Sequence, residues 1–302
     1  MEEVTLQIQS VIYQNKASDL KKAVTQAANA VRVAKEHGIC ISGSMVYGDA
    51  SAQAVLTEEE VADIQGMLPK EFRFSYRVFG MNTGTAKGHN LLAQHCSAAY
   101  LLIMNPDILM SPSCLYELFR SIKQKDAAMA EARQTPLEHA KAYEEKTGET
   151  QWASTACVLI RTSVFRSVHG FDADTFFMYC DDVDFSWRVR LAGYKILYQP
   201  RAVVYHAKQL SIGAKWLPTC AERYYSAEAA LLLSYKWSDF NRTRKLLKQY
   251  EACGGEDEKK AAAQFRKRQK EKRLPHPIDK NRKIGKFIGD EYGEMRFQIS
   301  GH

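Results

Sequence analysis

Short apolar runs alternate with amphipathic segments along the first third of the chain. Apolar, β-branched runs predict strands at residues 4–13, 39–46, 72–79 and 99–104. Apolar residues with helical spacing predict helices in the intervening segments, at 19–35, 58–67 and 89–96. Strands that alternate with helices in this way indicate an α/β fold with a mixed, mostly parallel sheet flanked by helices.

The second half of the chain follows a different pattern. Strands are predicted at 152–160 and 195–205, and helices at 182–191 and 221–235. Residues 126–150 are polar and charged, so we expect an excursion over the surface. From residue 254 onward the aliphatic content is too low for an independent core, which predicts a linker or a loosely held helix.

The composition is that of an ordinary globular protein. The 302 residues are 45% hydrophobic and 25% charged. The chain is long enough for one domain of roughly 200–250 residues and an extension. No window approaches the roughly 18–20 uninterrupted apolar residues of a membrane span, and the start does not have the pattern of a secretory signal. Seven cysteines without metal-binding or CxxC spacing indicate reduced thiols in the cytoplasm.

The net charge of +7 is concentrated near the C-terminus. Residues 236–290 contain 17 Lys and Arg against 8 Asp and Glu, which accounts for the whole excess. A charge run is usually a solvated face, and this one lacks the interleaved aromatics that stack on single-stranded nucleic acid. Attraction to an anionic membrane surface is therefore a more economical functional interpretation than nucleic-acid binding.

Three acids follow the aromatic run FFMYC, at Asp181, Asp182 and Asp184. Acids at the boundary between an apolar run and a helix are costly unless they meet a cation, a backbone donor or a substrate proton. A helix cap needs one acid. The others could pair with Arg188 and Arg190 or act as a general base, so we expect one structural acid and at least one functional one.

A second candidate site follows the apolar strand YLLIM, at Asn105-Pro106-Asp107. An acid at a strand tip could hold a divalent cation bound to phosphates, although Asn, Pro and Asp are also ordinary turn residues. His206 ends the later strand and becomes a candidate metal ligand only if Asp107 lies nearby.

Two further segments offer polar groups at strand ends. Asp49 could accept hydrogen bonds from a ribose or nucleobase, or it could be a turn acid. Residues 82–88 form a glycine-containing loop that matches neither a dinucleotide fingerprint nor a phosphate-binding loop. Within it, Lys87 could approach a phosphate or be solvated.

Taken together, these motifs resemble glycosyltransferase family 2, the inverting nucleotide-sugar transferases of the GT-A fold, and within it the bacterial rhamnosyltransferase-like branch. The resemblance covers about residues 4–240. It rests on separated motifs in the family's order: VIYQN at 11–15, GDAS at 48–51, NTGTAKGHN at 82–90, NPD at 105–107, and GFD, FFMY and DDVD between 170 and 184. Departures are the extra Gln14, an acid displaced by one position at Asp49, and Asp181 where the family has Glu.

The resemblance implies roles for individual residues. It makes Asp182 the catalytic base, with Asp181 beside it, and leaves Asp184 as the acid that starts the helix or pairs with arginine. Asp107 and His206 would hold Mn²⁺ or Mg²⁺. The implied donor-binding residues are Tyr13, Asn15, Asp49, Asn82, Gly84, Lys87, Asn90 and Asn105. The implied acceptor-binding residues are Trp152, Tyr179 and Arg188, with the aromatic ones equally suited to a core.

The resemblance also implies an activity and an organisation. The expected activity is inverting transfer from a nucleotide-diphospho-sugar, dTDP-rhamnose or a UDP-sugar, to a glycan or polyprenyl-linked saccharide of the bacterial cell surface. A donor half (about 1–110) and an acceptor half (about 111–240) would precede a basic helical extension (241–302). We expect a cytoplasmic protein, with peripheral contact at the inner membrane face. Alternatives are a catalytically impaired sugar-nucleotide-binding module of a larger synthase and a nucleic-acid binder.

Overall fold

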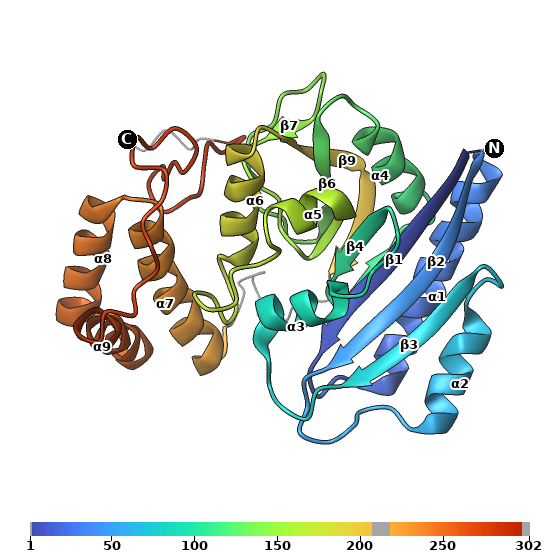
Figure 1. The fold of residues 1–302 in the computed structure, drawn as a ribbon, viewed down its shortest axis with the longest axis horizontal. Helices are drawn as coiled ribbons and strands as arrows, with labels where there is room; N and C mark the ends of the chain where they lie inside the picture. Colours follow the sequence, from blue (N-terminus) through green and yellow to red (C-terminus); the bar gives the residue numbers. More distant parts are fainter. Residues whose placement is uncertain (1, 207–217, 298–302) are drawn as a thin grey trace.

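A mixed sheet forms the centre of the computed structural model, which describes residues 2–206 and 218–297 (Figure 1). Within these residues it has nine strands, eight of them in the order β3-β2-β1-β4-β8-β6-β9-β5, with β7 paired to β9. Four neighbouring strands run parallel: β1 (Glu2–Ile12), β2 (Ile39–Asp49), β3 (Phe72–Val78) and β4 (Tyr100–Met104). The remaining strands are β5 (Ile108–Met110), β6 (Ala127–Thr135), β7 (Glu149–Thr150), β8 (Cys157–Arg161) and β9 (Lys195–His206).

Helices cover both faces of this sheet. Alternate residues of β4 point to opposite faces and enter two different hydrophobic clusters. Leu102 and Met104 belong to the first cluster, and Leu101 and Ile103 belong to the second. The first cluster includes residues of α1 (Ala17–Glu36), α2 (Glu58–Met67) and α4 (Cys114–Ile122). The second includes residues of α3 (Gly84–Ala93), α5 (Thr162–Ser167) and α6 (Asp181–Leu191).

The C-terminal helices form a bundle beyond α6: α7 (Cys220–Lys236), α8 (Phe240–Cys253) and α9 (Glu256–Lys270) (Figure 1). The prediction of a linker or loosely held helix after residue 254 is wrong, because Ala261, Ala262 and Phe265 of α9 are buried. They belong to the same hydrophobic cluster as Trp187 of α6 and Leu232 of α7, and the boundary expected at residue 240 therefore falls inside one continuous cluster.

The predicted elements are otherwise confirmed to within a few residues, with three further corrections. The surface excursion expected at 126–150 contains β6, whose alanines pack in the sheet and whose Glu131 is buried against Lys141. The third helix begins at Gly84 rather than near residue 89, so most of the expected glycine loop is helical. Residues 152–156 precede β8 instead of opening it.

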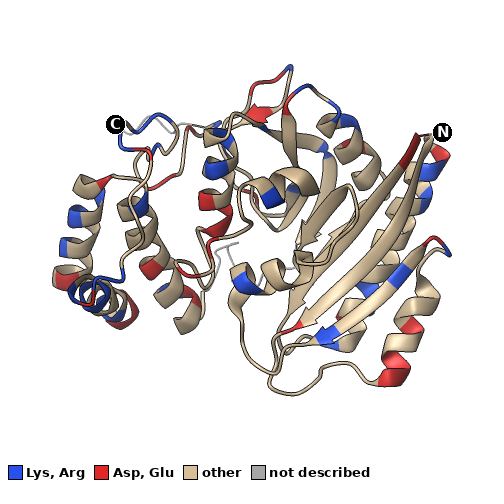
Figure 2. Cartoon of the chain, in the orientation of Figure 1, with Lys and Arg blue, Asp and Glu red and all other residues tan. Residues whose placement is uncertain are grey.

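The basic excess of the sequence is visible on α8 and α9, where Lys and Arg are interspersed with acids (Figure 2). Several of these basic side chains form ion pairs, such as Arg266 with Glu251 and Arg268 with Glu228. Others, including Lys245 and Lys248, are exposed. None of the helices in the described parts of the chain combines the length and the apolarity that crossing a membrane requires.

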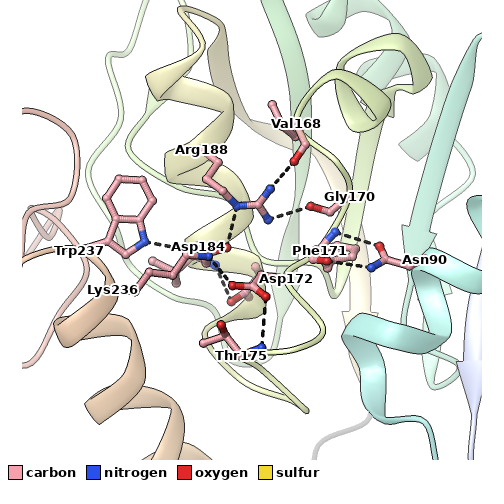
Figure 3. A network of polar contacts seen from close by, with 12 residues as sticks. Asn90, Val168, Gly170, Phe171, Asp172, Thr175, Asp184, Arg188, Lys236 and Trp237 are labelled. Carbon is pink, nitrogen blue, oxygen red and sulfur yellow. Dashed lines mark hydrogen bonds and ion pairs between the residues drawn. The ribbon is translucent and has the colours of Figure 1, made fainter. Parts of the chain in front are cut away.

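A buried carboxylate, Asp184, joins α6 to α7 (Figure 3). One oxygen accepts from Trp237 Nε1 at 3.0 Å and lies 2.7 Å from Lys236 Nζ, and the other accepts from Arg188 Nε at 2.8 Å. Lys236 also pairs with Asp172 at 2.7 Å. Asp184 is fully buried, and such a charge is tolerated only where donors and cations surround it. The prediction that Asp184 pairs with arginine is confirmed.

Replacing Asp184 by alanine should destabilise the protein by about 3–5 kcal/mol, because Lys236 and Arg188 would lose their shared buried counter-ion. Urea denaturation measures the free energy of unfolding. Asp63→Ala is the matched control, since Asp63 is half exposed and pairs with Lys21 at the surface. Its effect should stay below about 1 kcal/mol. Equal losses in the two variants would show that the Asp184 network is not a main support of the fold.

Candidate functional site

A cavity of about 730 Å³ opens at the carboxyl end of β4, the usual place for ligands on an α/β sheet. It brings together the predicted catalytic pair and metal pair, Asp181, Asp182, Asp107 and His206. Three other predicted residues also line it: Asn105, Trp152 and Tyr179. Further lining residues were missed by the sequence reasoning: Thr85, Gln134, His139, Glu222 and Tyr292.

The register of the sheet brings Asp107 and His206 together. Antiparallel pairing places Ile108 of β5 opposite His206, the last residue of β9. As a result, Asp107 Oδ2 lies 3.3 Å from His206 Nε2. On the other side of the ring, His206 Nδ1 is 2.8 Å from Gln134 Oε1. A proton on Nδ1 donates to that oxygen and leaves the lone pair of Nε2 facing the carboxylate.

This pair fits a divalent cation. Asn105 Nδ2 also lies 3.5 Å from Nε2, a long contact, so the closer approach of the lone pair and the carboxylate oxygen calls for a proton or a cation between them. One imidazole and one carboxylate suit Mn²⁺ or Mg²⁺, and both ions accept phosphate oxygens in the remaining positions. Within residues 2–206 and 218–297 no group of three or more His, Cys, Asp or Glu could hold a metal. Among the described residues, Asp107 and His206 are thus a pair rather than a complete metal site, and a bound phosphate or water could supply further ligands.

The two acids at the start of α6 differ in their surroundings. Asp181 is buried and its Oδ2 accepts from Thr85 Oγ1 at 2.9 Å, whereas Asp182 is half-buried and its Oδ1 accepts from the backbone N–H of Val183 at 2.8 Å. Burial, together with the charge of Asp182, raises the pKa of Asp181 to about 7. Burial also raises the pKa of Asp182, against the opposing effects of Val183 and the positive charge of Lys141. The two acids titrate as a pair, with Asp181 retaining a proton at higher pH than an ordinary aspartate.

A buried ion pair lies behind the cavity wall. Lys141 Nζ contacts Glu131 Oε2 and sits 3.9 Å from the centre of the Trp152 ring, and both charged side chains are almost fully buried. Burial raises the pKa of Glu131 and lowers that of Lys141, so each depends on the other to stay ionised. Trp152 is itself buried, and His139 packs edge-on against it. The Trp152 ring thus separates this pair from the cavity.

The two residues before the acids adopt a left-handed backbone. Tyr179 has φ 65° and Cys180 has φ 55°, a conformation that costs non-glycine residues roughly 1–2 kcal/mol each. Two side-chain contacts hold this turn. Tyr179 OH donates to Glu222 Oε1 at 3.2 Å, and Cys180 Sγ lies 3.2 Å from Tyr292 OH. No pattern in the sequence predicts either contact, because Glu222 and Tyr292 are distant along the chain from the turn.

The NTGTAKGHN motif is mainly scaffolding. The Asn82 side chain accepts from the N–H of Gly84, which has φ 66°. A Cβ at Gly84 would come within 2.2 Å of the Phe177 carbonyl oxygen, so only glycine fits there. Asn90 donates to and accepts from the backbone of Phe171, at 2.8 and 2.9 Å. These contacts give Asn90 a structural role, and its binding of the donor stays a prediction. The motif also brings Thr85 to Asp181.

The predictions that Asp49 binds the donor and that Arg188 binds the acceptor are corrected by the positions of these side chains. Asp49 is fully buried, and its oxygens accept from Ser51 N, Val55 N and Tyr76 OH, so it shapes a turn and cannot reach a ligand. Burial raises its pKa, but these hydrogen bonds outweigh that effect and lower it overall. Arg188 donates to Asp184 and to the carbonyl oxygens of Val168 and Gly170 (Figure 3). These contacts make it part of the scaffold, and it does not line the cavity.

The other predicted residues lie elsewhere around the site. Tyr13, which follows β1, and Lys87 are exposed, and Asn15 accepts from the N–H of Tyr13. Their proposed contacts with a donor stay predictions. Of the aromatic run, Phe176 is a core residue, while Phe177 stacks on Tyr225 with ring centres 4.7 Å apart.

Replacing Asp181 by asparagine should raise the melting temperature, and more so at pH 8 than at pH 4. The folded protein holds the Asp181 proton up to about pH 7, whereas the unfolded chain releases it near pH 3.8. Because only the unfolded chain ionises within that window, rising pH progressively favours unfolding, and asparagine, which does not titrate, removes the effect. Scanning calorimetry at the two pH values measures it. The exposed Asp174 provides a control, Asp174→Asn, that should show no pH-dependent gain. Equal gains at both pH values would refute a raised pKa at Asp181.

Comparisons with known proteins agree with this architecture. No family model matches the chain. A 62-residue stretch is 45% identical to N-acetylglucosaminyl-diphospho-decaprenol L-rhamnosyltransferase of Mycobacterium tuberculosis, and covers 20% of each chain. A 49-residue stretch is 43% identical to rhamnosyltransferase WbbL of Escherichia coli, covering 16% of this chain and 18% of WbbL. The chain thus matches only about a fifth of the length of these relatives.

Solved structures resemble the chain over most of its length. The mannosyltransferase PcManGT from Pyrobaculum calidifontis, in complex with GDP-Man and Mn²⁺, has a TM-score of 0.58 and 13% identity, covering 88% of this chain and 75% of PcManGT. GalNAc-T7 with UDP, GalNAc and Mn²⁺ has a TM-score of 0.62 and 12% identity, covering 90% and 56%. The predicted GT-A fold is therefore confirmed, and the chain is similar in sequence to rhamnosyltransferases of the family 2 type.

Proposed function

We propose that this protein is an inverting glycosyltransferase that uses a nucleotide-diphospho-sugar. The observation that carries the proposal is one cavity with two chemical centres. Asp107 and His206 face each other in it, and Asp181 and Asp182 lie in its wall. A carboxylate base can take the proton of the attacking hydroxyl, and a metal-binding pair can hold the cation that stabilises the departing diphosphate.

The first centre would receive the diphosphate. Asp107 and His206 would hold a divalent cation, and Gln134 orients the imidazole for this role. When bound, the cation supplies positive charge that stabilises the departing diphosphate. Asn105, which also lines the cavity, is positioned to donate hydrogen bonds beside it. Mn²⁺ is the first choice, because PcManGT and GalNAc-T7 were both solved with it.

The second centre would act on the acceptor. Asp182 accepts the proton of an acceptor hydroxyl, whose oxygen attacks the anomeric carbon from the face opposite the nucleotide. The bond to the diphosphate breaks on the other face, so configuration inverts without a covalent enzyme intermediate. Asp181, held by Thr85 and protonated to higher pH, limits the repulsion that a second negative charge beside Asp182 would cause.

The relatives suggest which substrates to test. The names of both curated relatives specify rhamnosyl transfer, and that of the mycobacterial enzyme also specifies an N-acetylglucosaminyl-diphospho-lipid. Accordingly, dTDP-rhamnose and a polyprenyl-diphospho-N-acetylglucosamine are the first donor and acceptor to examine, with UDP-sugars next. Contact with an anionic membrane, through exposed lysines such as Lys245 and Lys248, belongs to the same proposal.

The departures from the family pattern do not favour the alternative of a catalytically impaired module. The acid displaced to Asp49 leaves Gly48 in the position before it, and a Cβ at Gly48 would come within 2.5 Å of the Phe79 ring, so packing requires this glycine. The shorter Asp181 is engaged by Thr85, while Asp182 lines the cavity. Both departures are therefore compatible with a working base.

Incubation with dTDP-rhamnose, Mn²⁺ and the lipid acceptor should release dTDP, and Asp182→Asn should lower the rate by about 100-fold or more, because the base is lost. Chromatography of the nucleotides measures release, and NMR of the product reports its anomeric configuration. Asp174→Asn should behave as wild type, since Asp174 is exposed. Full transfer by Asp182→Asn would disprove the assignment of the base, and retained configuration would disprove the single displacement.

Asp107→Asn and His206→Gln should each weaken Mn²⁺ binding on the order of tenfold or more, because each removes one of the two protein ligands. Calorimetric titration with MnCl₂ in the presence of dTDP measures the affinity. His37→Gln is the control, as His37 is an exposed histidine that stacks on Tyr116. Unchanged affinity in both site variants would place the metal elsewhere.

A further inference from the structure

The chain returns to the cavity close to its C-terminal end. The N–H of Ala142 donates to Glu294 O at 2.7 Å, and the N–H of Arg296 donates to Ala140 O at 2.8 Å. Lys141 and Met295 form an antiparallel bridge between these two contacts. The segment 284–297 is thus tied to the loop that carries the buried Lys141.

This segment inserts Tyr292 into the wall of the cavity. Its ring makes edge contacts with Trp152, Trp187 and Phe287, with ring centres 5.8, 6.5 and 6.3 Å away. Three large aromatic neighbours leave the ring little freedom. The hydroxyl is therefore held at a defined position, 3.2 Å from Cys180 Sγ.

Cys180 is the residue immediately before the two acids and the second member of the left-handed turn. Such a turn persists only where its surroundings hold it. Its first member, Tyr179, is held by Glu222 of α7, and its second by Tyr292. The orientation of Asp182 at the start of α6 follows from the orientation of this turn.

We propose that Tyr292 is a positioning residue for Asp182 and acts through its hydroxyl contact with Cys180. The inference rests on the proposed role of Asp182 as the base. It makes the C-terminal segment, which lies beyond the part of the chain that resembles family 2, a component of the active site. Tyr292 is a cleaner test than Glu222, because Glu222 also caps α7 by accepting from the N–H of Thr219.

Tyr292→Phe removes the hydroxyl and keeps the aromatic ring. It should lower kcat for dTDP release from dTDP-rhamnose with Mn²⁺ and acceptor by about 10- to 100-fold, because a misoriented base transfers the proton poorly. KM for the donor should stay within about twofold, since donor binding depends on the other centre. Tyr235→Phe, a hydroxyl deletion on α7 outside the cavity, is the matched control and should match wild type.

Double mutants separate positioning from a general structural effect. Cys180→Ala should reproduce the loss seen in Tyr292→Phe, and combining the two changes should add nothing. In an Asp182→Asn background, Tyr292→Phe should have no further effect on kcat. Cys180→Ala also serves as the test if Tyr292→Phe does not fold.

A second readout does not depend on turnover. Cys180 is buried, so its alkylation by iodoacetamide, followed by mass spectrometry of its peptide, reports whether the turn is held. Tyr292→Phe should accelerate alkylation of Cys180 roughly tenfold while leaving that of the exposed Cys220 and Cys253 unchanged.

Two outcomes would overturn the inference: unchanged kcat and alkylation in Tyr292→Phe, or a loss in kcat that multiplies fully in the Asp182→Asn background. Full activity of Asp182→Asn alone would instead overturn the proposed base. Alkylation of Cys180 would then still test the anchoring contact without reference to activity, because an unchanged rate in Tyr292→Phe would show that Tyr292 does not hold the turn.

Discussion

The buried carboxylate of Asp184 is the constraint on which the arrangement of the site depends. It lies in the first turn of α6, two residues after Asp182. It accepts hydrogen bonds from Arg188 of its own helix and from Trp237, and it forms an ion pair with Lys236 at the end of α7. Because a buried charge must keep all its partners, α6 cannot rotate or slide without losing them. The start of α6, and with it the acid pair, is thereby fixed against the C-terminal bundle.

A second constraint comes from the sheet and is independent of the first. Pairing of β5 with β9 brings Asp107 to His206, and Gln134 of β6 completes the setting of the imidazole. Backbone register thus defines one centre, and side-chain ion pairing defines the other. The proposed chemistry needs both centres in one cavity, which is why the GT-A sheet and the C-terminal helices have to be considered together.

Sequence reasoning reached the α/β fold and both pairs of acidic and metal-binding candidates, because strand tips and helix starts follow from local pattern. It could not show which polar side chains the fold itself engages. The Asn90 amide is bonded to the backbone of Phe171, 81 positions away, and Asp49 is buried and accepts from the N–H groups of Ser51 and Val55. Strand β6 was missed because an acid such as Glu131 indicates a surface position, and the sequence does not show that Lys141 pairs with it in the interior.

The C-terminal segment shows the same limit most clearly. Tyr292 lies 112 positions from Cys180, and nothing in its local sequence marks it as part of a cavity. Low aliphatic content in this region predicted that it has no independent core. This part of the prediction is right, because α9 shares its core with α6 and α7. Local composition could not reveal that the segment after α9 returns to the site.

The proposed mechanism places a metal and diphosphate centre and a carboxylate base in one cavity. Anomalous diffraction from crystals soaked with MnCl₂ and dTDP can locate both. We expect one manganese peak within about 2–2.5 Å of both the Asp107 carboxylate and His206 Nε2, with the diphosphate bound to it and Asp182 facing the same cavity. A peak bound elsewhere, or a diphosphate seated without metal away from Asp107, would contradict it.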